Sequence, residues 1–305
     1  MEGNCSQACL RRGDPLHRFI FRLAVFLICV AAGRAEAQFY TGPIASGAGG
    51  AGRAAADASE SSYLNPASLS FIKDYNVSFA YASSDHPVDG ARITYAGMLA
   101  DGTAERLVPG SLSFVHRFTE YPDQSGAYTE QDYQASFSGM VARGLSLGAS
   151  AHRQLYKPGR GSEATQDNAT IGALWVPTTS LGLAAVGYDL IPSNVGAPAL
   201  VRQSPTYAVG INYLFSDLFR VRADVVRPTE GPRNGRNNVM AGFESQFRPD
   251  FIFRAGMQWR ETEDKTMWTV GVGFHGPRLS FDYAFEKDLR VDVGFRHVID
   301  MWLPL

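Results

Sequence analysis

The sequence predicts an all-β protein: a 14-stranded antiparallel transmembrane β-barrel with an N-terminal plug in its lumen. Three observations predict this fold. From Tyr75 onward, fourteen segments alternate apolar and polar residues, the segments are about ten residues long, and short turns alternate with longer polar loops between them. These segments lack the 3.6-residue apolar spacing of a helix, so we expect very little helix in the body of the chain.

The first 37 residues have the three parts of a secretory signal peptide. A basic region with four arginines leads into an apolar stretch over 23–32, and Ala35-Glu36-Ala37 has the form that signal peptidases cut. A membrane anchor is the alternative, but about ten apolar residues fall short of the ~20 that a spanning helix needs. We therefore expect export through a cleaved signal peptide and, given the barrel, a location in the outer membrane of a Gram-negative cell.

Removal of residues 1–37 would change the composition of the chain. All three cysteines (Cys5, Cys9 and Cys29) lie there, which excludes a disulfide scaffold, a thiol enzyme and a cysteine-ligated metal site. The segment also holds five of the 28 basic and three of the 30 acidic residues, so 23 basic and 27 acidic residues remain, a formal charge of −4. The chain has no surplus of basic residues that would indicate nucleic-acid binding. The remaining 268 residues contain no interdomain linker; we expect a plug over 38–74 and the barrel over 75–305.

The first of the alternating segments illustrates the pattern. Tyr75, Val77 and Phe79 alternate with small or polar residues, as expected of a strand with two different faces. The fourteen segments lie near 75–84, 91–100, 110–120, 129–142, 145–156, 167–177, 181–191, 204–215, 219–228, 237–248, 251–260, 266–275, 279–286 and 290–299. Turns such as Arg143-Gly144 alternate with loops such as 121–127, and only 101–109 is long for a turn.

One face of these strands is apolar and rich in aromatic residues. Examples are Tyr207, Val209, Ile211, Tyr213 and Phe215; Phe251, Phe253, Met257 and Trp259; Trp268, Val270, Val272 and Phe274; and Leu279, Phe281, Tyr283 and Phe285. Hydrocarbon offers no water to unpaired backbone groups, so a sheet can span a membrane only when it closes on itself. A secreted β-sandwich alternates in the same way, but the strand length and the polarity of the opposite face favour a barrel.

The opposite face carries small residues and charges of both signs. We expect Arg92, Arg117, His152, Arg222, Asp224, Glu244, Arg254, Asp282 and Arg296 to face the lumen, together with Glu286, Arg290 and Asp292. An open porin has such a face, and so does a lumen whose charges pair with one another around a plug.

The segment before the first strand is rich in glycine and alanine. Its glycines allow positive φ and close backbone approach, and residues 54–58 are predicted to form one short helical turn. The run Gly47-x-Gly49-Gly50-x-Gly52 loosely matches a dinucleotide-binding loop, but such a loop requires a preceding strand and a following helix, which are missing. A plug in a confined lumen is the better interpretation.

These residues also carry a family resemblance. The run Gly47-Ala-Gly-Gly-Ala-Gly-Arg53, then Ala56-Asp57 and Leu64-Asn65-Pro66-Ala67, resembles the N-terminal segment of FadL-type (OMPP1/FadL/TodX) outer-membrane transporters of fatty acids and hydrocarbons, and that of the related PorV/PorQ-like barrels. The motif covers about 25 residues, and the strand number agrees with the family over the rest of the chain.

The resemblance implies that the segment is a hatch inside the barrel and that a break in the wall releases hydrophobic ligand sideways into the membrane. The ligand or hatch residues would be Gly47, Gly49, Gly50, Gly52, Asp57, Asn65, Pro66 and Ala67, with Asn65 to Ala67 at the base of the hatch. From the residues themselves, Pro66 fixes φ and Asn65 bonds local backbone; an ordinary N-terminal turn is the alternative. The loops here are shorter than in typical family members, and the chain ends on Met301-Trp302-Leu303-Pro304-Leu305 rather than on an aromatic residue.

Two functions therefore remain open, both without catalysis, cofactor or metal. The first is passive uptake of a small hydrophobic compound, for which Met98, Met140, Leu174, Leu214, Met240 and Met267 are the inward apolar candidates. The second is a sealed, PorV-like barrel that acts as a scaffold or secretion accessory with homo-oligomeric or other membrane partners. An enzyme is disfavoured, since no nucleophile, base and acid share a recognisable spacing around His152 or His275. Membrane lipid is expected around either one.

Overall fold

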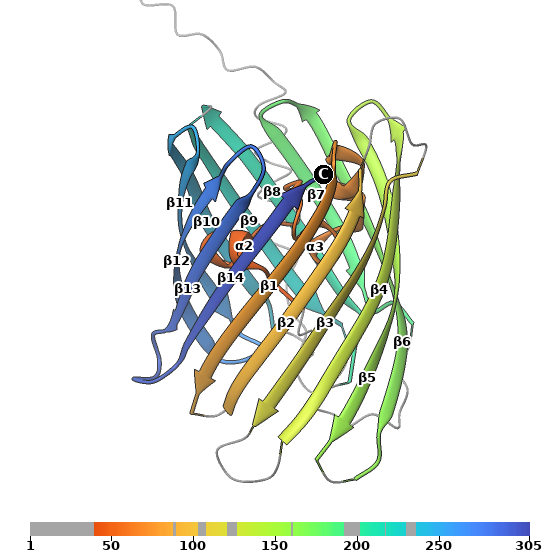
Figure 1. The fold of residues 1–305 in the computed structure, drawn as a ribbon, viewed down its shortest axis with the longest axis vertical. Coiled ribbons are helices and arrows are strands. Elements are labelled where there is room, and N and C mark those ends of the chain that lie inside the picture. Colours follow the sequence, from red (N-terminus) through yellow and green to blue (C-terminus); the bar gives the residue numbers. More distant parts are fainter. Residues whose placement is uncertain are drawn as a thin grey trace, which may run out of the picture. The chain divides into compact units, whose positions relative to one another are not determined.

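The fold is a closed antiparallel barrel. The computed structural model describes residues 40–87, 90–102, 108–120, 127–159, 161–191, 202–216, 218–229 and 236–305. Within these residues, fourteen strands each pair with their neighbours in sequence, and β1 pairs with β14 to close the ring (Figure 1). This confirms the predicted all-β, 14-stranded barrel. The predicted signal peptide lies outside the described residues.

The strand positions agree closely with those expected from alternation. The strands are β1 Tyr75–His86, β2 Gly90–Asp101, β3 Gly110–Glu120, β4 Ala127–Ala142, β5 Leu145–Pro158, β6 Ala164–Thr178, β7 Leu181–Tyr188, β8 Thr206–Ser216, β9 Phe219–Pro228, β10 Asn238–Arg248, β11 Phe251–Arg260, β12 Lys265–His275, β13 Ser280–Asp288 and β14 Phe295–Pro304.

Two strands differ from the prediction. β7 ends at Tyr188 instead of 191, because Asp189 has a φ of 53° and leaves the extended conformation. β14 begins at Phe295 instead of 290, because the Asp288 amide donates to the Gly294 carbonyl (2.9 Å) and closes a loop over 289–294. Arg290 and Asp292 therefore lie exposed in that loop, and their predicted place in the lumen was wrong.

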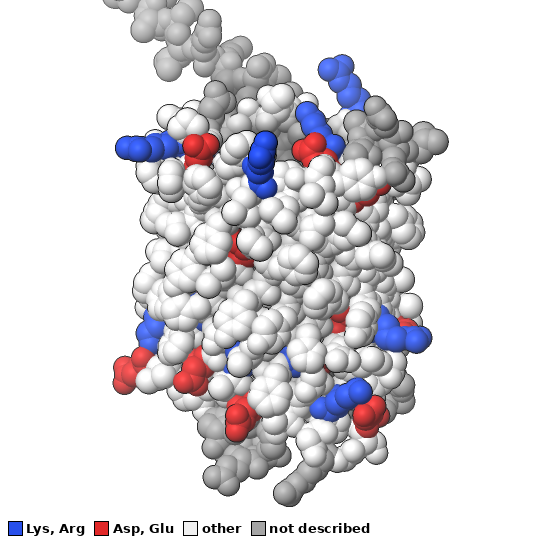
Figure 2. Space-filling view, in the orientation of Figure 1, with Lys and Arg blue, Asp and Glu red and all other residues white. Residues whose placement is uncertain are grey.

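The outward face of the barrel is apolar, as the alternation predicted. On β11, for example, Phe251, Phe253, Met257 and Trp259 are exposed while Arg254 and Gln258 between them are buried. Figure 2 shows a largely uncharged belt across the middle of one side, with charged side chains mostly toward the two ends. Such a belt suits contact with the hydrocarbon of a bilayer.

Residues 40–74 pack against the inward face of the strands on opposite sides of the ring. They contain the helices α2 (Pro43–Gly47) and α3 (Ser61–Leu64) and the 3₁₀-helix η1 (Pro66–Phe71). α2 contacts β11 to β14, and η1 contacts β4 to β6 (Figure 1). None of the helices within the described residues is long and apolar enough to cross a membrane.

The helical turn expected over 54–58 was placed wrongly. Those residues form turns and bends, and helical structure occurs on either side of them. Helix formation follows local signals instead: Pro43 stands at the start of α2, and the Asn65 side chain accepts from the Ala67 amide (3.1 Å) at the start of η1.

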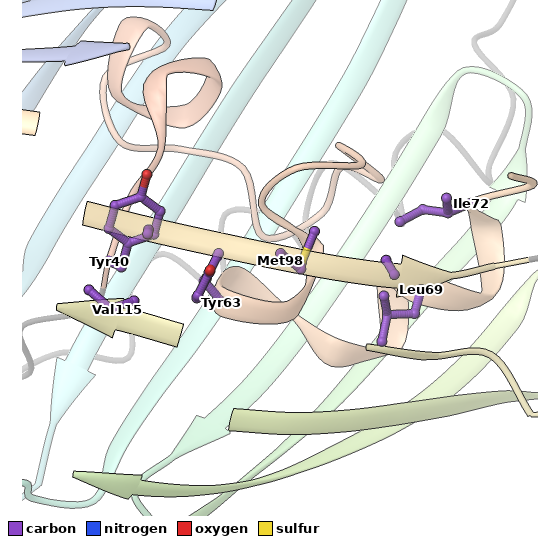
Figure 3. Packing of buried hydrophobic residues seen from close by; sticks show 8 residues of the cluster. Tyr40, Tyr63, Leu69, Ile72, Met98 and Val115 are labelled. Atoms are coloured by element: carbon purple, nitrogen blue, oxygen red, sulfur yellow. The ribbon is translucent and has the colours of Figure 1, made fainter. Parts of the chain in front are cut away.

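An apolar cluster joins this segment to β2 and β3. Tyr40, Tyr63, Leu69 and Ile72 pack with Met98 and Val115 of the wall (Figure 3). The rings of Tyr40 and Tyr63 meet edge to face, with centroids 4.8 Å apart. The cluster fixes both ends of the segment against one side of the barrel.

Candidate functional site

The candidate site is the interface between residues 40–74, which we call the N-terminal segment, and the inward face of the wall. The glycine run begins this interface. Thr269 of β12 donates to the Gly47 carbonyl (3.0 Å) and accepts from the Gly49 amide (3.0 Å), so one wall hydroxyl holds the turn after α2. Gly49 and Gly50 have φ values of 69° and 78°, and a Cβ on Gly49 would overlap the Ala241 carbonyl of β10. Only glycine combines this conformation with so close an approach.

A buried ion pair follows the glycine run. Asp224 of β9 accepts from the Gly52 amide (2.8 Å), the Arg53 amide (3.1 Å) and the Arg53 guanidinium (3.0 Å). Arg53 Nε donates to the Tyr188 hydroxyl (3.0 Å), and both charged side chains are only 1% exposed. A single wall carboxylate thus binds both the backbone and the cation of the segment.

A chain of ion pairs starts at Asp57. Asp57 pairs with Arg222, which also donates to Glu244 (3.3 Å). Glu244 accepts from Arg254 (2.8 Å), and Arg254 donates in turn to Asp282 (2.6 Å). Because Arg222 and Arg254 are each 1% exposed, their charges are offset by these carboxylates rather than by water.

Glu60 connects two parts of the segment to each other. Its carboxyl accepts from the amides of Ile44 (2.7 Å) and Ala45 (3.0 Å) at the start of α2. Burial, and next the negative charge of Asp57, raise the pKa of Glu60 to about 8, although the Ala45 and Ile44 amides act in the opposite direction.

Asn65, Pro66 and Ala67 lie against β5 and β6. The Asn65 amide group donates to the Arg53 carbonyl (3.0 Å) and to the Ala173 carbonyl of β6 (3.3 Å). Gly148 and Gly172, which are cross-strand partners, provide the space: a Cβ on Gly172 would overlap Asn65 Oδ1, and one on Gly148 would overlap the backbone of Pro66 and Ala67. The motif therefore needs two glycines in the wall, which the sequence analysis did not single out.

We predict that Gly172→Ala lowers the free energy of unfolding by about 1–3 kcal/mol, since its methyl group would displace the Asn65 carbonyl oxygen and leave buried polar groups unpaired. Urea unfolding in detergent micelles measures the change. Gly139→Ala is the matched control, because a Cβ there has no neighbour within 4 Å. Equal stabilities for the two variants would contradict the close packing of Asn65.

The structure brings all the predicted hatch residues to this interface. Gly47, Gly49, Gly50, Gly52, Asn65, Pro66 and Ala67 are buried, and Asp57 is partly buried. Of the predicted lumen charges, Asp224 pairs with Arg53, and the ion pairs that start at Asp57 contain Arg222, Glu244, Arg254 and Asp282. Arg296 joins the interface by donating to the Thr41 carbonyl (2.7 Å) and to Ser46 (3.0 Å), and it pairs with Glu286 (3.2 Å).

The other predicted charges pair within the wall or just beyond it. Arg92 donates to Thr119 (3.1 Å) and Arg117 lies 3.7 Å from Glu130. His152 lies between Asp132 (3.5 Å) and Asp189 (3.1 Å), the residue at which the chain leaves β7. These contacts do not involve the N-terminal segment.

Sequence reasoning missed several partners. Arg53 was quoted within the motif but was not assigned a contact, and Glu60, Glu130, Tyr188 and Asp189 were not considered. The other four residues meet their partners only once the chain folds: Glu60 within the segment, Glu130 across the β3–β4 pair, and Tyr188 and Asp189 through contacts with Arg53 and His152.

The inward apolar candidates do not form one pocket. Met98, Leu174 and Met240 are buried, but they belong to three separate clusters, packed around Tyr63, Ala67 and Tyr188 respectively. Met267 is buried as well, and Leu214 is partly buried. Met140 shares the inward register of Ser138 but lies at the end of β4, where it is 52% exposed. These side chains mostly pack the wall and the segment in this conformation.

The fold and this interface define a class of protein: a 14-stranded β-barrel with a buried N-terminal segment. Similar solved structures include the Ralstonia pickettii toluene transporter TbuX (15% identity, TM-score 0.72, 87% of this chain and 98% of that chain). They also include the CymD monoaromatic hydrocarbon channel (14% identity, TM-score 0.66, 87% and 97%) and the Pseudomonas putida toluene transporter TodX (14% identity, TM-score 0.64, 88% and 97%).

The chain therefore has the fold of the FadL-type hydrocarbon transporters, as the N-terminal motif indicated. No family model matches the sequence, and no curated protein matches it. These solved structures are transporters and channels, not enzymes.

Proposed function

We propose that the protein spans the outer membrane and passively takes up small hydrophobic compounds, with residues 38–74 as a hatch in its lumen. The observation that carries this proposal is the shared fold with toluene and monoaromatic hydrocarbon transporters, over 87% or more of this chain. The closed ladder and the apolar outward face support membrane insertion. An exported chain, with its signal peptide cleaved after 37, is part of the same proposal.

The hatch would have to move for a ligand to pass. In the conformation described here, the N-terminal segment binds wall strands from β2 to β14, and the apolar side chains around it are packed. Most of its polar contacts to the wall end on hydroxyls or charged groups, such as Thr269 and Asp224, which water can solvate once the segment is displaced. A displaced segment would expose Met98 and Leu174 as part of an apolar path.

The proposed lateral exit lies between β6 and β7. β7 pairs with β6 only from Ile171 to Thr178, so within the described residues no strand pairs with 164–170 of β6 on that side. There the Leu190 amide donates to the Ala169 carbonyl (3.0 Å) and the Ile191 amide to Asn168 Oδ1 (2.8 Å). Opening the wall here breaks these few hydrogen bonds instead of a continuous ladder between two strands. This seam is therefore the easiest place for hydrophobic ligand to leave sideways.

Liposome flux tests the proposal. We expect vesicles containing the refolded barrel to take up toluene faster than empty vesicles, and to take up glycerol no faster, because the lumen charges are paired and packed. A barrel lacking 38–70 should admit both solutes. Equal toluene entry with and without the intact barrel would overturn the proposal.

A sealed scaffold is the second candidate, and the buried Arg53–Asp224 pair and the buried ion pairs from Asp57 to Asp282 favour it. Paired charges that tie the segment to β9, β10, β11 and β13 suit a lumen that stays closed. A scaffold would conduct neither solute in the same assay and would copurify with other membrane proteins after mild extraction.

A further inference from the structure

The outward face of the wall carries a groove that crosses β1 to β6. Its volume is about 850 Å³, within the range of small-molecule sites. Ala135, Ala151 and Ala169 form its floor, since they are consecutive cross-strand partners on β4, β5 and β6. Phe114, Tyr133 and Ile191 contribute to its sides. Larger outward side chains such as Phe137 and Ile171 follow on the same strands, so the groove is a local depression in the apolar belt.

A charged pair stands at one end of this groove. Arg153 follows Ala151 on the same outward face of β5, and Asp167 precedes Ala169 on β6. Arg153 Nε and Nη2 donate to the two Asp167 oxygens (2.6 and 2.8 Å), and the side chains are 61% and 58% exposed. The carboxylate therefore binds one edge of the guanidinium, the edge that carries Nε and Nη2.

The other edge of this guanidinium is available to a ligand. Among the described residues, Arg153 Nη1 has no hydrogen-bond partner. Arg153 also lies toward the end of β5 that continues into the longer loop after Pro158, the end that faces the cell exterior in barrels of this kind. Its cross-strand partner is Tyr133, an exposed aromatic residue of the kind that forms the girdles of membrane barrels at the headgroup level.

We infer that the groove is a lipid site: the acyl chain of a membrane lipid lies over Ala135, Ala151 and Ala169, and its headgroup phosphate binds Arg153 Nη1. A phosphate is the favoured headgroup because a guanidinium forms charge-assisted hydrogen bonds with phosphate oxygens. Asp167 already orients the guanidinium of Arg153. The apolar floor gains from burying methylene groups. A membrane lipid is favoured over a soluble ligand because the groove opens on the face that contacts the bilayer. This inference rests on the proposed membrane location but not on transport.

Native mass spectrometry of the detergent-purified barrel tests the site. The probes are phosphatidylglycerol, the diacylglycerol with the same acyl chains, and the corresponding free fatty acid. We expect phosphatidylglycerol to be retained in preference to the other two. Arg153→Gln should reduce its retention by about tenfold, the effect of one charge-assisted hydrogen bond. Ala151→Phe should reduce the retention of every probe by filling the floor.

Lys157→Gln is the matched control, because Lys157 is an exposed cation on the same face of β5, nearer the loop, and pairs with Glu163 (3.8 Å). It should leave retention unchanged. The inference is overturned if Arg153→Gln retains phosphatidylglycerol as the unmodified barrel does, if diacylglycerol or the fatty acid is retained equally well, or if the groove is covered by a second copy of the chain in a lipid-free dimer. Toluene flux is also measured on Arg153→Gln. Because the lipid inference does not rest on transport, the flux tests the uptake proposal separately from the lipid site.

Discussion

Replacement of Asp224 by asparagine is expected to destabilise the protein by about 3–5 kcal/mol, the usual cost of leaving a buried charge without its partner. Asparagine keeps the shape of the side chain and an oxygen that can accept from the amides of Gly52 and Arg53. It removes the negative charge that offsets the guanidinium of Arg53, which is 1% exposed and has only the Tyr188 hydroxyl as another close side-chain oxygen partner among the described residues. The lost stability therefore measures the ion pair and not the hydrogen bonds from the two amides.

Urea unfolding, followed by tryptophan fluorescence in detergent micelles, measures this effect. Asp167→Asn is the matched control, since it removes the carboxylate of an Arg–Asp pair that is 61% and 58% exposed. That change should have a much smaller effect, because an exposed ion pair contributes little to stability. Asp224→Asn within about 1 kcal/mol of the unmodified protein would show that the buried guanidinium of Arg53 does not need the Asp224 carboxylate to offset its charge.

A disulfide between the N-terminal segment and the wall is expected to lower toluene flux by at least about tenfold. Ser62 Oγ lies 2.9 Å from Ser136 Oγ of β4, so Ser62→Cys and Ser136→Cys place two thiols within reach of each other. The crosslink is covalent, so this part of the segment cannot leave β4 while the disulfide is intact, and about 1.4 kcal/mol of added opening cost is already tenfold. The three natural cysteines all precede residue 30, so the mature barrel we propose adds no competing thiol.

The comparison is between oxidised and reduced samples of the same double variant. Flux should fall on oxidation and recover with reductant, whereas each single variant should behave like the unmodified barrel under both conditions. Undiminished flux through the oxidised protein would mean that ligand passes without movement of the segment near Ser62, which would contradict the hatch. No flux in any sample would favour the sealed scaffold.

The wall was predictable because its determinants are local. Alternation along one strand, as in Phe251, Phe253 and Met257 against Arg254, depends only on which residues face the membrane. The predictions failed where alternation continued past a turn. The sequence around Arg290 and Asp292 alternates like a strand, but the hydrogen bond from Asp288 to Gly294 closes a loop there. The short helical turn was also misplaced, since alanine content at 54–58 is a weaker signal than Pro43 and Asn65 at helix starts.

The candidate site was predictable in its members but not in its pairing. The glycine run and Asn65-Pro66-Ala67 carry backbone requirements that are visible in the chain itself, and the inward charges followed from strand parity. Which carboxylate meets which arginine did not follow. Asp224 and Arg53 are 171 residues apart, and Glu60 binds α2 across a turn of the same segment. Strand parity says that a side chain points inward, but not at what height or toward which neighbour.

By itself, the sequence determined that this chain builds a wall of fourteen strands with one apolar and one charged face. The alternation of side chains along a strand is a local property and does not depend on distant residues. Only the tertiary structure decided which charges pair around the buried N-terminal segment. It also decided that three alanines on adjacent strands leave a groove beside Arg153. The physical reason is that ring closure brings residues from distant strands to one point, and the register between strands fixes which of them meet.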